Sequence, residues 1–127
     1  MQVCLYWVQS SKDVWVAEAT AEYSKKISRF CDFTLDSIRA SRKSRSQFEQ
    51  KTREEEISIL KKIKSTDYVV VFDESASPVK DSRAFSKKIT TALEGPHKRV
   101  VFIVGGAFGL GAQIKARADL AISLSTL

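Results

Sequence analysis

Apolar residues in this chain occur partly as short continuous blocks, the usual pattern of buried strands. The blocks Tyr68 to Asp73 (YVVVFD) and Arg99 to Gly106 (RVVFIVGG) are rich in β-branched residues and predict strands covered on both faces. Val3 to Val8 (VCLYWV) is a further apolar run of strand length, and Leu120 to Ser125 (LAISLS) predicts a last strand. Phe33 to Ile38 (FTLDSI) alternates apolar and polar residues, as a half-exposed strand does.

Other stretches carry apolar residues three or four positions apart, which predicts helices between these strands. The stripes are Trp15, Ala19, Tyr23 and Ile27; then Ile57, Leu60 and Ile63 within Phe48 to Lys64; then Phe85, Ile89 and Leu93. Asp81 or Ser82 introduces the last of these helices, and Gly95-Pro96 ends it. A short helix from about Gly111 to Arg117 precedes the final strand.

Strands and helices therefore alternate along the whole chain. Strands separated by helices need crossover connections, which give a parallel sheet layered by helices. We expect an α/β fold with a five-stranded, parallel-type sheet, in which Tyr68–Asp73 and Arg99–Val104 form the centre. No repeat or linker interrupts the pattern, so residues 1–127 are expected to form one domain.

Composition narrows the class of protein. A content of 43% hydrophobic and 28% charged residues is ordinary for a globular protein. No apolar run reaches the roughly 18 residues needed to cross a bilayer, and the start, MQVCLYWVQSSKD, lacks the features of a signal peptide. Cys4 and Cys31 lie on separate predicted elements without metal-ligand spacing. We therefore expect reduced thiols, no metal, no membrane contact and a cytoplasmic location.

Positive charge is concentrated in one segment. The chain has 21 Lys and Arg against 15 Asp and Glu, a net charge of +6. Between Arg39 and Arg53 the cations are opposed only by Glu49, and serines separate them. This segment is either a solvated linker or an arm that binds RNA phosphates by releasing counterions. The candidate RNA contacts are Arg39, Arg42, Lys43 and Arg45.

Ligands of open α/β sheets bind beyond the carboxyl ends of the strands. That rule selects the segments Phe72 to Ser77, Gly105 to Gly111 and Ser123 to Leu127. The second, GGAFGLG, lacks side chains that would block a crevice and is followed by a helix N-terminus with free N–H groups. It matches neither G-x-G-x-x-G nor a Walker motif, which disfavours dinucleotides and nucleoside triphosphates. The alternative is a tight turn that needs glycine only for its backbone.

Three segments in this order make the chain recognisable: WVAEATAEYSKKISRF, REEEISILKKIKSTDYVVVFDESA and VVFIVGGAFGLGAQIKARADLAISLSTL. Over essentially all 127 residues the chain resembles the RlmH (YbeA-like) family of SPOUT-class, trefoil-knot methyltransferases. The resemblance implies transfer of a methyl group from S-adenosyl-L-methionine (SAM) to N3 of a pseudouridine in 23S rRNA, by a homodimer. It also implies that SAM lies against backbone at Phe72, where the family commonly has leucine, and at Gly105, Leu124, Ser125, Thr126 and Leu127.

The resemblance also implies a difference at the C-terminus. Family members continue past this point through a Pro-His pair, an Arg-containing helix and a basic Tyr-His tail, which form the knot and close the pocket. A chain ending at Leu127 is therefore expected to be C-terminally incomplete and unknotted. Truncation and a natural short form with lost or changed activity both remain open, and the end directly after a strand favours truncation.

The sequence assigns no catalytic base. Asp73 and Glu74 follow a strand near the expected pocket, but acidic turns are more often solvated than catalytic. His97, the only histidine, is expected at the surface, and Trp7 and Trp15 in packing. Two alternatives to the enzyme are a non-catalytic RNA-binding or ribosome-associated module that has lost the cofactor pocket, and a flavodoxin-like nucleotide binder. A titration with SAM separates the first alternative from the enzyme.

Overall fold

The computed structural model of the chain describes residues 1–9, 14–39, 48–105 and 110–124. Strands and helices alternate over the described residues, in the order predicted from the sequence. The elements are β1 (Gln2–Gln9), α1 (Val14–Ile27), β2 (Asp32–Arg39), α2 (Phe48–Leu60), β3 (Tyr68–Phe72), α3 (Ser82–Glu94), β4 (Arg99–Val104), α4 (Ala112–Arg117) and β5 (Leu120–Ile122). The prediction of an α/β fold is confirmed.

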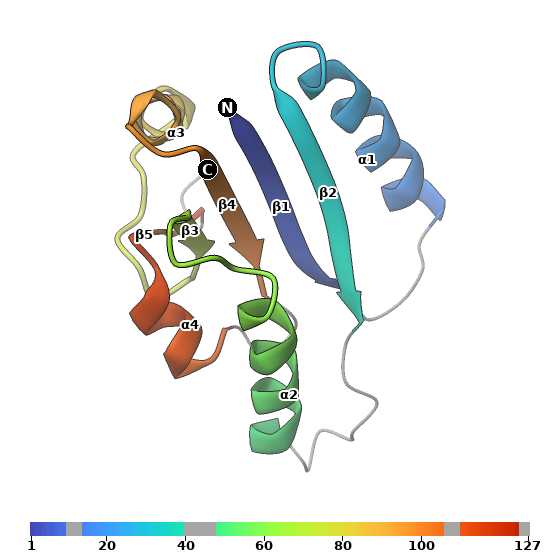
Figure 1. Ribbon diagram of the computed structural model, residues 1–127, viewed down its shortest axis with the longest axis vertical. Helices are drawn as coiled ribbons and strands as arrows, with labels where there is room; N and C mark the ends of the chain where they lie inside the picture. The colour runs from blue at the N-terminus through green and yellow to red at the C-terminus, as the bar shows by residue number, and fades with distance from the viewer. Residues whose placement is uncertain (10–13, 40–47, 106–109, 125–127) are drawn as a thin grey trace.

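The strands form one five-stranded sheet in the order β2-β1-β4-β3-β5. Every pairing in it is parallel, and the arrowheads of β1, β2 and β4 point the same way in Figure 1. The predicted central strands do pair with each other, and β4 occupies the middle position. A flavodoxin-like sheet has the order 2-1-3-4-5 instead. The flavodoxin-like alternative is therefore wrong.

The helices cover both faces of the sheet. Helix α1 leads from β1 to β2 and α3 from β3 to β4, and both connections move toward the β2 edge of the sheet. Helix α2 leads from β2 to β3 and α4 from β4 to β5, and both move toward the β5 edge. Because parallel crossovers are almost always right-handed, the two pairs of helices belong on opposite faces. Buried contacts agree: Ile59 of α2 and Ile114 of α4 pack in one core cluster, and Ala92 of α3 packs in the other.

Strands β3 and β4 supply the most enclosed part of both clusters. Val69, Val70 and Val71 are fully buried, as are Val100 and Val101. Successive side chains of a strand point to opposite faces, so one run of valines contributes to both clusters. The continuous apolar blocks of the sequence therefore mark the strands that helices cover on both sides, as predicted.

Helix α1 differs from its prediction. Tyr23 is 62% exposed and Ile27 is 38% exposed, so the far end of the predicted apolar stripe lies at the surface. Ala19 is half-buried, and the side chain of Trp15 lies outside the described residues. A shallow apolar groove separates α1 from Leu5, Phe33 and Leu35 of the first strands. The stripe indicated a helix correctly but not a fully packed one.

Both cysteines are free, with Cys4 buried and Cys31 half-buried. The expectation of a buried thiol is thus confirmed at Cys4. In the part of the chain that the structure describes, no helix is long and apolar enough to cross a membrane.

Candidate functional site

Three strands of the sheet end next to one another. Phe72, the last residue of β3, pairs with Val104 at the end of β4 and with Ile122 at the end of β5. Because these strands are parallel, the segments that follow them leave the sheet at the same edge. The segments that start at Gly105 and Ser123 therefore flank the one that starts at Asp73. This is the convergence that the expected cofactor site requires.

The predicted cofactor-binding residues differ in how far they are exposed to solvent. Phe72 is half-buried, and its ring lies 6.2 Å from the rings of Phe85 and Phe102, measured between centroids. Its side chain is thus committed to the core cluster under α3. Gly105 is half-buried, and Leu124 is 42% exposed. The predicted residues Ser125, Thr126 and Leu127 lie outside the described residues.

The segment after β3 is tied to the segment after β5. The Asp73 N–H donates to the Ile122 carbonyl at 3.0 Å, and the Ser123 N–H donates to the Ser77 carbonyl at 3.2 Å. The Val79 N–H returns a bond of 3.3 Å to the Ser123 carbonyl, and Ser123 is only 1% exposed. These main-chain bonds fix the mouth of the candidate site between two strand ends, a link that sequence reasoning missed.

The Asp73 carboxylate forms a hydrogen bond and an ion pair at this edge of the sheet. Its carboxylate accepts from the Ser75 hydroxyl at 2.9 Å and lies 3.4 Å from the Lys115 ammonium of α4. Burial would raise the pKa of Asp73, but the bonds from Ser75 and the charge of Lys115 outweigh it and hold the pKa below its ordinary value. Asp73 is therefore ionised at neutral pH, and a carboxylate of low pKa is a weak proton acceptor.

The start of α4 is not open to a ligand in the way the sequence suggested. Oε2 of Glu56 accepts the N–H of Gln113 at 2.9 Å and the N–H of Ile114 at 3.2 Å. Glu56 belongs to α2 and is 8% exposed. We call residues 105–111 the glycine segment. The expectation of free N–H groups after it is wrong for Gln113 and Ile114.

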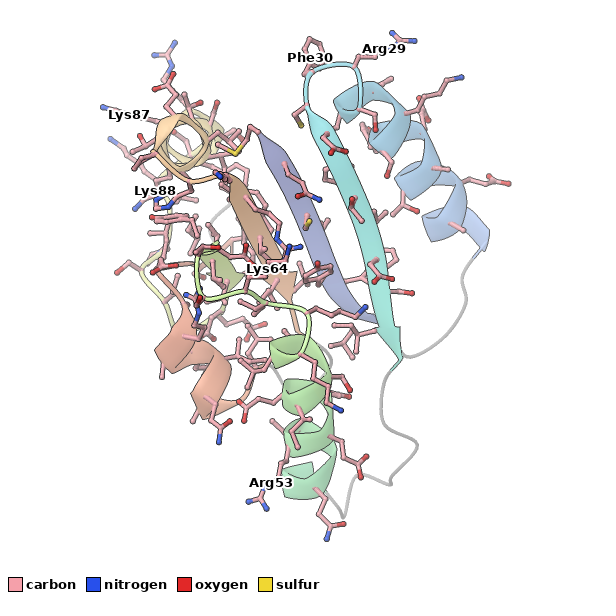
Figure 2. All side chains as sticks on the ribbon, viewed as in Figure 1. Arg29, Phe30, Arg53, Lys64, Lys87 and Lys88 are labelled. Carbon is pink, nitrogen blue, oxygen red and sulfur yellow. The ribbon has the colours of Figure 1, made fainter. Side chains whose placement is uncertain are left out.

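The basic segment starts from the same sheet edge. Trp7 of β1 pairs with both Ser37 of β2 and Val104 of β4, and Arg39 ends β2 two residues beyond Ser37. Only β1 lies between β2 and β4, a separation of about 10 Å at ordinary strand spacing. The predicted contacts Arg42, Lys43 and Arg45 lie outside the described residues. Arg53 of α2 is exposed and projects at the end of the molecule to which the strands point (Figure 2).

His97 and Trp7, which the sequence did not assign to the cofactor site, lie as follows. His97 is half-buried near the amino ends of β3 and β4, with its ring 4.7 Å from that of Tyr68, the first residue of β3. It therefore stands at the sheet edge opposite to the candidate site. Trp7 is half-buried, and its Nε1 is enclosed without a hydrogen-bond partner among the described residues. The described residues contain no cluster of His, Cys, Asp or Glu that would hold a metal ion.

Comparison with known proteins bears on the whole chain. A family described as "Predicted SPOUT methyltransferase" matches residues 1–127. The ribosomal RNA large subunit methyltransferase H of Bdellovibrio bacteriovorus is 43% identical over 127 residues, which are 100% of this chain and 81% of that protein. The methyltransferase H of Leuconostoc citreum is 35% identical over 131 residues, covering 100% of this chain and 82% of its own length. That of Ruminiclostridium cellulolyticum is 30% identical with the same coverage, 100% and 82%.

Proposed function

The chain belongs to the SPOUT methyltransferase family, and from that premise we propose that it methylates large-subunit ribosomal RNA with SAM as donor. The proposed target is N3 of a pseudouridine in 23S rRNA, as the resemblance to the RlmH family implies. Relatives named ribosomal RNA large subunit methyltransferase H support the class of substrate.

One observation carries the proposal: β3, β4 and β5 end at the same level of the sheet. A cofactor bound at this edge would meet the backbone of the three strand ends and apolar side chains, beside the ion pair of Asp73 and Lys115. Gly105 has no side chain to fill that space, and the Phe72 ring turns into the core. These residues and Leu124, which follows β5, fit an adenosyl group held by main-chain bonds. Ser125, Thr126 and Leu127, next in the sequence, complete the proposed set of cofactor contacts.

When bound, SAM supplies an activated methyl group. The residues of this chain would hold and orient it, and orientation of two reactants removes much of the entropic cost of their encounter. Methylation at a ring nitrogen also requires loss of the N3 proton. Asp73 is a poor candidate for that task because its pKa is held low. The catalytic base stays unassigned.

We propose that the basic segment binds the RNA. Arg39 ends β2 at the sheet edge where β3, β4 and β5 also end. Arg42, Lys43 and Arg45 follow it in the sequence. Clustered cations favour RNA because each phosphate contact releases counterions. Arg53, exposed on α2, adds a described cation on this side. A cytoplasmic location accords with ribosomal RNA as substrate.

A homodimer, expected from the family, is part of the proposal. The family resemblance places such contacts at helices near the cofactor site. Sedimentation of the purified chain measures its mass directly. A monomer at all concentrations would remove the dimer from the proposal without touching the chemistry.

Methyl transfer itself is the test of the proposed function. The 127-residue chain is incubated with tritiated SAM and unmodified large ribosomal subunits, and radioactivity is measured in 23S rRNA. We expect label in 23S rRNA, at one nucleoside identified by mass spectrometry as N3-methylpseudouridine, and none in small-subunit rRNA. Binding of rRNA without SAM binding or label would instead support a non-catalytic RNA-binding module.

A further inference from the structure

A carboxylate from one helix caps the start of another in this fold. Glu56 lies on α2, and Gln113 and Ile114, whose N–H groups it accepts, lie in the first turn of α4. The bonds measure 2.9 and 3.2 Å and both end on Oε2. At 8% exposure the carboxylate is largely removed from water, so it depends on these donors for its stability.

Helix α4 has no cap of its own. Its N-cap residue, Gly111, has no side chain to accept the N–H groups that every helix leaves unpaired in its first turn. Ser, Thr, Asp and Asn usually serve at this position by bonding the second or third N–H. Glu56 bonds the second and third residues of α4 and replaces that side chain from outside the helix. A negative charge here also complements the positive end of the helix dipole.

Gly111 is needed for room rather than for its backbone conformation. Its φ of −72° and ψ of 164° are accessible to any residue. A Cβ added at Gly111, however, would collide with the Glu56 carboxylate, which supplies all three of the nearest atoms. The glycine and the carboxylate therefore form a pair: one leaves space that the other fills.

Helix α4 connects this pair to the candidate cofactor site. Leu110 and Gly111 are the described end of the segment that starts at Gly105, and Leu110 is buried in the core cluster beneath α2. Lys115 of the same helix reaches Asp73, the residue that follows Phe72. The position of α4 thus bears on two of the three segments that leave the sheet at this edge.

We propose that Glu56 is a positioning residue that fixes the start of α4 and thereby sets the affinity for SAM. This inference rests on the proposed function, because it assumes that SAM binds beside Gly105. Glu56 acts through α4 and touches no part of the substrate. The loss of its bonds leaves the N–H groups of Gln113 and Ile114 unpaired and frees the start of α4, which follows Leu110 and Gly111.

The first measurement compares SAM binding by calorimetry for the wild-type chain, Glu56→Ala and a matched control, Glu94→Ala. Glu94 is an exposed residue at the end of α3, just before the amino end of β4, whereas Gly105 follows the carboxyl end of that strand. We expect the dissociation constant for SAM to be roughly tenfold larger in Glu56→Ala, because the variant loses charge-assisted hydrogen bonds. The Glu94→Ala constant should equal that of the wild type.

Two further variants separate positioning from simple damage to the fold. Gly111→Ala should weaken SAM binding in the wild-type background but add nothing in the Glu56→Ala background, because the three atoms nearest to its methyl group all belong to the Glu56 carboxylate. Glu56→Ala combined with Gly111→Ser should recover SAM affinity, because the serine hydroxyl caps α4 in the space that the carboxylate has left. A purely structural defect would show neither the cancellation nor the recovery.

Amide hydrogen exchange without SAM reports on the cap itself. Glu56→Ala should lower the protection of Gln113 and Ile114, and Gly111→Ser should restore it. SAM binding that is equal in wild type and Glu56→Ala, or absence of recovery by Gly111→Ser, overturns the inference. A wild-type chain that binds no SAM overturns the proposed function and the SAM part of the inference together, and the exchange data then decide whether the cap exists.

Discussion

The Asp67 carboxylate is almost fully enclosed, at 1% side-chain exposure, and pairs with Arg99. It accepts from Nε and Nη2 of Arg99 at 2.9 and 2.7 Å, and from the Lys64 N–H at 2.7 Å. The same Nη2 also donates to the Lys62 carbonyl at 2.7 Å. The pair joins the turn after α2 to the start of β4. It lies at the amino edge of the sheet, so we assign it to stability rather than to the chemistry.

Replacing Asp67 should destabilise the protein more than replacing an exposed partner of a similar ion pair. Asp67→Asn leaves the Arg99 charge buried and unpaired, which typically costs about 3 kcal/mol. Asp36→Asn removes the exposed 2.7 Å pair with Lys62 and should cost less than about 1 kcal/mol. Urea unfolding of both variants measures the difference. Equal losses would show that enclosure adds nothing to the Asp67 pair.

Acid should weaken the fold through the same residue. Burial would raise the pKa of Asp67, but the bonds from Arg99 and the Lys64 N–H outweigh it and hold the pKa below its ordinary value of 3.8. The unfolded chain therefore takes up the proton first as the pH falls. The contribution is complete above about pH 4 and is lost as the pH drops through the lower folded pKa. Urea unfolding at a series of pH values should show a shallower acid loss in Asp67→Asn.

At the scale of elements, α3 is the helix whose start and end the sequence predicted best. Asp81 is its N-cap, and its carboxylate accepts the Ala84 N–H at 2.8 Å. The helix ends at Glu94, before Gly95. Phe85, Ile89 and Leu93 of the predicted stripe pack against the core cluster of that face. Local signals sufficed here because the cap and the stripe lie within the helix itself.

Removal of this cap should cost stability without touching the site. Asp81→Ala leaves the Ala84 N–H to water and should lower the free energy of unfolding by about 1 kcal/mol. Lys80→Ala, a neighbouring exposed residue, serves as control and should change it little. Thermal unfolding compares the two. If the Asp81 cap contributed nothing to stability, Asp81→Ala and Lys80→Ala would melt at the same temperature.

Other element ends depend on residues far along the chain, and there the sequence was less informative. Helix α2 was expected to reach Lys64 but ends at Leu60. The carbonyls of Lys62 and Lys64 instead accept from Arg99 and Arg117. The last strand was expected to reach Ser125, but β5 ends at Ile122 because Ser123 pairs with the segment after β3. No local pattern announces such distant partners.

At the scale of the whole molecule, the strand-end rule found the candidate site but not the groups that support it. Phe72 and Gly105 were predicted from the ends of two apolar blocks, and the sheet register brings them to one edge. Glu56 was missed because its partners lie 57 and 58 residues away. The strand order was also not predicted, since helical crossovers allow several neighbours for each strand.

The RNA-binding role of the basic segment can be tested against a matched set of cations near the amino end of β2. Charge reversal of Arg42, Lys43 and Arg45 should weaken 23S rRNA binding and flatten its salt dependence by roughly two in log–log slope, at about 0.7 to 0.9 per phosphate contact. The control reverses Lys25, Lys26 and Arg29, all exposed; Figure 2 shows Arg29 beside the turn before β2. SAM affinity should be unchanged in both variants. An equal loss of rRNA affinity in the control would show that only net charge matters.

The proposed methyl transfer requires SAM to occupy the edge where β3, β4 and β5 end. Calorimetric titration of SAM into the wild-type chain and into Gly105→Val tests this most directly, with thermal unfolding to verify that both are folded. We predict micromolar binding at one site in the wild type and at least a tenfold loss in Gly105→Val, because a branched side chain would keep the cofactor from the backbone at the end of β4. Equal SAM affinity in the two folded proteins, or no binding by the wild type, would contradict it.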